Sequence, residues 1–227
     1  MEDKLINVFC GHYGSGKTNV AVNFAFDLRK RHDKVSILDL DIVNPYFRTK
    51  DSETELKEKD IELICSSYAA SNLDIPALPS EMYAPFCGNN NYTVLDIGGD
   101  DRGAVALGRF APLIKKSGNY QMLFVVNFYR PLTQTAKEAI EVMREIENAC
   151  SLSFTGIVNN ANVGIQTKKE YVEETFSLVQ KLCELSSLPL VMTTVREDLS
   201  EQFDNNSLNI FPLKLQKSIL GGKNGFH

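Results

Sequence analysis

The chain has 227 residues, of which 43% are hydrophobic and 23% are charged, so its composition is that of a folded domain rather than a disordered segment. The formal net charge is -5 and the sequence pI is about 5.3, which disfavours a general binder of nucleic acid or of a membrane surface. No apolar run approaches the roughly 20 residues of a membrane span, and the first residues predict no signal peptide.

Short apolar runs alternate with stretches of helical periodicity. Strands are expected over residues 5–10, 34–41, 61–65, 92–99, 122–127, 154–159 and 188–192, with a small edge strand over 208–211. Helices are expected over residues 18–28, 51–60, 81–87, 104–116, 133–150 and 168–185. This alternation predicts a three-layer α/β fold, a mainly parallel sheet flanked by helices.

The domain organisation and the cellular setting follow from the same features. One domain is expected over residues 1–227, with residues 212–227 as a flexible tail. The 5 cysteines are scattered and form no Cys-x-x-Cys pair, which favours a reduced, cytoplasmic protein.

A glycine-rich segment joins the first expected strand to the first expected helix. It reads G-x-x-x-x-G-K-T, the pattern of a phosphate-binding loop. Glycines allow backbone N–H groups to turn toward an anion, and the helix directs its positive end at the same anion. Lys17 is expected to reach the terminal phosphates, and the Thr18 hydroxyl to bind Mg²⁺. The nucleotide-binding loop thus comprises Gly11, His12, Tyr13, Gly14, Ser15, Gly16, Lys17 and Thr18.

Three aspartates at expected strand ends complete the candidate site. Asp96 precedes Gly99 in a D-x-x-G pattern, so we expect it to help hold Mg²⁺ while Gly99 senses the γ-phosphate. Asp41 is the candidate for orienting or deprotonating the attacking water, and Asp39 for supporting the metal shell. Each aspartate could instead serve only to cap the turn that follows it.

Four segments together resemble the MinD/ParA-like branch of phosphate-loop ATPases, which also includes the nitrogenase iron protein and dethiobiotin synthetase. They are the loop at residues 11–18, Leu38-Asp39-Leu40-Asp41, residues 94–99 and residues 156–160. The resemblance implies binding of ATP with Mg²⁺, slow hydrolysis, often a homodimer that sandwiches the nucleotides, and a partner protein that is moved or activated.

The resemblance also implies roles for single residues. Asp41 matches the switch aspartate that orients water, Asp96 the second acidic element, and Asn159 an asparagine that contacts adenine. An amide can both donate to and accept from one base edge, whereas a guanine site more usually carries Asn-Lys-x-Asp. Residues 159–162 read Asn-Asn-Ala-Asn, which favours ATP over GTP. The chain departs from many relatives at His12 and Tyr13, which replace the signature lysine and first glycine of the loop.

The sequence therefore predicts a cytoplasmic, Mg²⁺-dependent ATPase whose nucleotide state regulates a partner protein. Two alternatives stay open. One is a small-molecule kinase or ligase of the dethiobiotin-synthetase type, with its acceptor between Tyr46 and Tyr83. The other is a regulatory module that binds ATP without hydrolysing it.

Overall fold

The structure is a computed structural model that describes residues 3–41, 49–65, 80–86, 91–203 and 209–215. Within these residues, eight strands form one sheet in which every paired neighbour is parallel. The strands are β1 (Ile6–Cys10), β2 (Val35–Leu40), β3 (Glu62–Cys65), β4 (Tyr92–Ile97), β5 (Tyr120–Val126), β6 (Gly156–Asn159), β7 (Leu190–Arg196) and β8 (Ile210–Leu213). Their order is β3-β2-β4-β1-β5-β6-β7-β8, which places β1 between β4 and β5.

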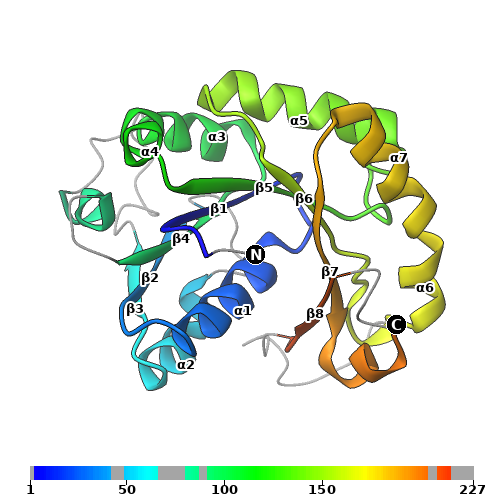
Figure 1. The fold of residues 1–227 in the computed structure, drawn as a ribbon, viewed down its shortest axis with the longest axis horizontal. Coiled ribbons are helices and arrows are strands. Elements are labelled where there is room, and N and C mark those ends of the chain that lie inside the picture. The colour runs from blue at the N-terminus through cyan, green and yellow to red at the C-terminus, as the bar shows by residue number, and fades with distance from the viewer. Residues whose placement is uncertain (1–2, 42–48, 66–79, 87–90, 204–208, 216–227) are drawn as a thin grey trace, which may run out of the picture.

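Helices cover both faces of this sheet, as Figure 1 shows. The described α-helices are α1 (Lys17–Arg29), α2 (Glu53–Glu58), α3 (Asp101–Gly108), α4 (Ala111–Ser117), α5 (Ala136–Cys150), α6 (Lys169–Glu174) and α7 (Phe176–Ser186). The helices α1 and α2 pack on one face, and α3, α4, α5 and α7 on the other. Every residue of β1 and β2 is buried, as expected for a parallel sheet covered on both sides. The predicted three-layer α/β fold is confirmed.

Two predicted helices are each divided in the structure. The helix expected over residues 104–116 is α3 followed by α4, and Pro112 lies in the first turn of α4, where its missing N–H costs nothing. The helix expected over residues 168–185 is α6 followed by α7, with Thr175 between them. The Thr175 hydroxyl donates to the carbonyl of Val172 at 2.7 Å and accepts from Asn159 at 2.9 Å. Apolar periodicity is insensitive to such local breaks.

The tail expected over residues 212–227 was placed too early. Pro212 and Leu213 belong to β8, and Leu213 is completely buried. Beyond them, the backbone of Lys214 exchanges two hydrogen bonds of 2.9 Å with the side chain of Asn23 on α1. These contacts hold residues 212–214 against the rest of the fold; residues 216–227 lie outside the described residues.

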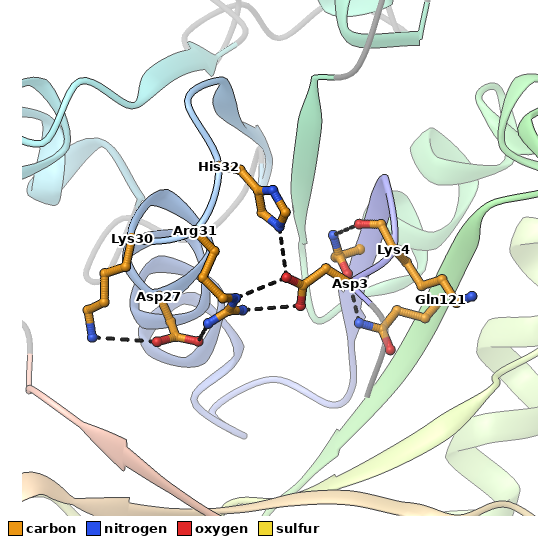
Figure 2. A network of polar contacts seen from close by, with 8 residues as sticks. Asp3, Lys4, Asp27, Lys30, Arg31, His32 and Gln121 are labelled. Atoms are coloured by element: carbon orange, nitrogen blue, oxygen red, sulfur yellow. Dashed lines mark hydrogen bonds and ion pairs between the residues drawn. The ribbon is translucent and has the colours of Figure 1, made fainter.

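A polar network ties the first described residues to the end of α1 (Figure 2). Asp3 accepts hydrogen bonds of 2.9 and 3.1 Å from Arg31, and its carboxylate lies 2.7 Å from Nε2 of His32. The imidazole of His32 stacks on the ring of Tyr92, with 3.6 Å between the ring centroids. The hydrogen bonds from Arg31 lower the pKa of the Asp3 carboxyl below its usual value of 3.8, although partial burial opposes the shift.

Among the described helices, none combines the length and the apolar character that crossing a membrane would require.

Candidate functional site

The glycine-rich loop lies at the edge of the sheet where the parallel strands end. The loop leaves β1 at Cys10 and turns into α1 at Lys17. Gly16, which caps α1, has a φ of 87°, a left-handed conformation that favours glycine. A Cβ at this position would also lie 2.3 Å from Nδ2 of Asn160. Glycine is therefore required here both for the turn and for the close approach of Asn160.

Lys17 extends back along the loop rather than into solvent. Its Nζ donates to the carbonyl of His12 at 3.1 Å, and the residue is only 5% exposed. Burial lowers the pKa of the Lys17 ammonium, while the charges of Asp96 and Asp41 act in the opposite direction. The structure thus holds a poorly solvated cation next to two carboxylates, an arrangement suited to stabilising phosphate charge.

Asp39 and Asp96 stand opposite each other in the register of β2 and β4. Asp96 is completely buried, and its Oδ2 accepts a hydrogen bond of 2.9 Å from the hydroxyl of Thr49. Burial raises the pKa of the Asp96 carboxyl to about 6, against the opposing effects of Thr18, Lys17 and Thr49.

Four buried side-chain oxygen atoms have no hydrogen-bond partner within the described part of the chain: Oδ1 of Asn159, Oγ1 of Thr193, Oδ1 of Asp96 and Oγ of Ser15. The last two belong to the candidate nucleotide site. An unpaired buried oxygen is costly, and both atoms belong to residues predicted to face Mg²⁺ or phosphate. Thr18, another of the residues predicted to hold the metal, is hydrogen-bonded to Asp96. Because Mg²⁺ takes hydroxyl and carboxylate oxygens and keeps several waters, these residues fit the ion. Within the described residues, no three or more His, Cys, Asp or Glu side chains are grouped so that they could hold a metal ion by themselves.

Asp41 lies just beyond β2, beside the segment that follows β4. Its backbone N–H donates to Oδ1 of Asp39 at 2.9 Å, so the side chain of Asp39 helps to position Asp41. A Cβ on Gly98 would lie 3.2 Å from Oδ1 of Asp41, which shows how closely the two segments approach. The structure thus brings together Asp39, Asp41 and Asp96, as the positions of their strands predicted.

Gly99 packs directly against the loop. A Cβ at Gly99 would lie 2.6 Å from both N and Cα of Tyr13 and 2.8 Å from Nζ of Lys17. No side chain larger than hydrogen fits between these atoms without movement. The segment after Asp96 is therefore in contact with the loop.

Asn159, predicted to contact adenine, is completely buried, and its amide donates to the hydroxyl of Thr175 at 2.9 Å. The structure directs this side chain toward the break between α6 and α7, so the adenine contact stays a prediction. The next residue, Asn160, makes a contact with the loop that the sequence does not indicate. Asn160 donates to the carbonyl of Ser15 at 2.6 Å, while its own oxygen accepts from Thr194 at 2.6 Å.

The acceptor pair named for the alternative kinase function is only partly described. Tyr46 lies outside the described residues. Tyr83, in the short 3₁₀ helix Ser80–Phe86, packs on Phe110 with ring centroids 5.0 Å apart and joins the core. Tyr83 therefore contributes to packing in this structure.

A strand, a glycine loop, a buried lysine and carboxylates at the adjacent strand ends define a phosphate-loop nucleotide-binding protein. Residues 8–209 match the family model of the CobQ/CobB/MinD/ParA nucleotide binding domain, and the chain belongs to this family. The resemblance drawn from the motifs is thereby confirmed. No curated protein sequence matches the chain.

Solved structures share the fold at low sequence identity. FtsY from Mycoplasma mycoides is 18% identical, with a TM-score of 0.56, over 84% of this chain and 59% of that one. Cell division protein FtsY from Thermotoga maritima is 15% identical, with a TM-score of 0.58, over 86% and 62%. FlhF, solved with GTP and Mg²⁺, is 13% identical, with a TM-score of 0.55, over 85% and 66%. The chain thus spans less than two thirds of the length of each of these proteins.

Proposed function

We propose that the protein is a Mg²⁺-dependent ATPase whose nucleotide state controls its association with a partner protein. The observation that carries this proposal is the convergence of Lys17, Asp41 and Gly99 on one loop at the carboxyl edge of the sheet. Family membership supports nucleotide binding, while hydrolysis, the base and the partner are inferred from the residues.

In the proposed reaction, the oxygen of a water molecule bonds to the γ-phosphorus of ATP, and the bond from that phosphorus to the β,γ-bridging oxygen breaks. The products are ADP and phosphate, and the proton lost by the water leaves through Asp41 or the phosphate itself. Lys17 and the loop amides stabilise the charge that develops on the transferred group. Thr18 and Asp96, with support from Asp39, would hold Mg²⁺, which supplies further charge neutralisation when bound.

The choice of ATP rests on the Asn-Asn-Ala-Asn segment at residues 159–162, which lacks the lysine and aspartate of a guanine-reading pattern. FlhF shares the fold and was solved with GTP and Mg²⁺, so GTP is the competing nucleotide to test. Asn159 is completely buried. If adenine is recognised by an amide of this segment, that amide must become accessible to the base.

The partner protein and the oligomeric state are part of the same proposal. Loss of the γ-phosphate would release the contacts around Asp41 and Gly99, and this movement would change the surface that a partner meets. A homodimer that sandwiches the nucleotides between its subunits would form without the loop lysine of many relatives, because His12 occupies that position. We place the protein in the cytoplasm on the composition of its cysteines.

Equilibrium binding of fluorescent ATP and GTP analogues, with Mg²⁺ or with a chelator, tests the proposal. Wild-type protein should bind ATP more tightly than GTP, and Mg²⁺ should strengthen the binding. Lys17→Ala should abolish binding, because it removes the buried cation. Lys30→Ala is the matched control, since that side chain is 74% exposed just after α1. Failure of the wild-type protein to bind either nucleotide would overturn the proposal.

A further inference from the structure

A cavity of about 380 Å³ lies beside the loop, between α3 and α5. Its walls are apolar and come from both helices: Ala104 on α3, and Val142, Ile146 and Ala149 on α5. Its floor includes Gly98, Gly99 and Tyr13. Figure 1 shows the two helices next to each other on the same face of the sheet. We call this space the α3–α5 cavity; its volume is suited to one or two side chains of a ligand.

Leu132 lines the rim of this cavity in an unfavourable conformation. It is 61% exposed and has a φ of 64°, which a leucine rarely adopts. Leu132 follows Pro131 in a turn closed by a hydrogen bond of 3.3 Å from Thr133 N–H to the carbonyl of Arg130. Glycine would normally occupy this position of such a turn. An exposed apolar side chain kept at the cost of backbone strain points to a contact with another molecule.

Three carboxylates line the cavity, from Asp100, Asp101 and Glu145. His12 also lines it, and no lysine or arginine is among the described residues that do so. Tyr13, which is 54% exposed, adds a second apolar group at the loop side. The cavity therefore combines an apolar interior with a negatively charged rim, which complements an apolar side chain flanked by positive charge.

We propose that the α3–α5 cavity docks a basic segment of a partner protein that inserts an apolar side chain between Leu132 and the two helices. This inference rests on the proposed function, because it assigns a surface and a partner chemistry to the regulation proposed there. Gly99 forms part of the cavity floor and contacts both Tyr13 and Lys17 of the loop, so the docking surface and the nucleotide site share residues. A nucleotide that shifts Gly99 would change the shape of the cavity.

The probe is a fluorescein-labelled peptide, acetyl-Lys-Arg-Phe-Leu-Arg-Lys-amide, titrated with the full chain at low ionic strength and followed by fluorescence anisotropy. One comparison peptide has glutamate in place of each basic residue, and another has serine in place of Phe and Leu. The wild-type protein should bind the first peptide at least about tenfold more tightly than either comparison. Equal binding of all three peptides, or no binding, would overturn the inference.

Two pairs of variants locate the site. Leu132→Gly and Glu145→Lys should each weaken peptide binding by about tenfold. The matched controls are Leu185→Ala, another exposed leucine, and Glu141→Lys, an exposed glutamate on α5 outside the cavity lining; both should bind the peptide like the wild type. Leu132→Gly should melt at the same or a higher temperature than the wild type, because glycine relieves the positive φ. Peptide binding that is unchanged in both cavity variants would place the site elsewhere and contradict the inference.

The same samples are titrated with the fluorescent ATP analogue. Loss of peptide binding with intact nucleotide binding contradicts only the docking surface. Loss of nucleotide binding by the wild-type protein contradicts the proposed function itself.

Discussion

The side-chain amide of Asn160 donates to the backbone carbonyl of Ser15 at 2.6 Å, so the residue that follows β6 holds the glycine-rich loop in place. In a trans peptide the C=O and the next N–H point in opposite directions. Fixing the Ser15 carbonyl therefore turns the N–H of Gly16 away from Asn160. Thr194 on β7 completes the chain of contacts by donating to Asn160 at 2.6 Å. Residues from β6 and β7 thus help to determine which way the backbone amides of the loop point.

Asn160→Asp should weaken nucleotide binding by about tenfold to a hundredfold, because it replaces a buried donor with a carboxylate that repels the Ser15 carbonyl. Asn119→Asp, just before the opposite end of β5, is the matched control. The oxygen of Asn119 accepts from the Leu5 N–H at 3.3 Å, and an aspartate retains that contact. Calorimetric titration of the two variants measures the difference. Equal affinities would show that Asn160 does not position the loop.

Gly99→Ala should reduce the ability of the protein to distinguish ATP from ADP by about tenfold. The added methyl group would meet the Tyr13 backbone at 2.6 Å, so the segment must withdraw from the loop and from the position proposed for the γ-phosphate. The ratio of the two dissociation constants reports this effect. Gly108→Ala, within α3, is the control, since its nearest contact would be 3.3 Å. An unchanged ratio in Gly99→Ala would remove this segment from the proposed switch.

Asp3→Asn should lower the free energy of unfolding at neutral pH by at most about 1 kcal/mol, because the network at the end of α1 is partly exposed. The folded-state pKa of Asp3 lies below its unfolded value of 3.8. The contribution of the carboxylate is therefore complete above that pH and disappears as the pH falls through the folded-state pKa. Urea denaturation of both proteins between neutral and acid pH should give curves that converge. A difference independent of pH would mean that ionisation of Asp3 is not its source.

The sheet and the loop could be predicted from the sequence because each depends on a local pattern. Apolar runs located the strands, and the spacing of Gly11, Gly16 and Lys17 defined the loop. The positions of Asp39 and Asp96 at strand ends were sufficient to bring them together, since parallel strands end at one edge.

The remaining features depend on contacts between distant segments. The break at Thr175 is stabilised by a hydrogen bond from Asn159 at the end of β6. The helical periodicity of the sequence does not reveal such a bond. The adenine contact assigned to Asn159 stays a prediction, and the contact of the adjacent Asn160 with the loop had no signal in the sequence. The pairing of Asn160 N–H with the carbonyl of Val126 at 2.8 Å places the second asparagine at the loop, and this register is set by the fold. The positive φ of Leu132 could not be predicted from the sequence either. The turn position after Pro131 usually carries glycine when its φ is positive, and here it carries leucine.

The proposal that this chain is an ATPase is tested most directly by single-turnover hydrolysis of ATP with Mg²⁺ by the wild type and by Asp41→Ala. The variant should bind ATP normally and hydrolyse it about a hundredfold more slowly, because it lacks the carboxylate proposed to orient the water. Asp33→Ala, which changes an exposed residue before the opposite end of β2, should hydrolyse ATP at the wild-type rate. Hydrolysis by Asp41→Ala at the wild-type rate, or no hydrolysis by the wild-type protein, would contradict the account.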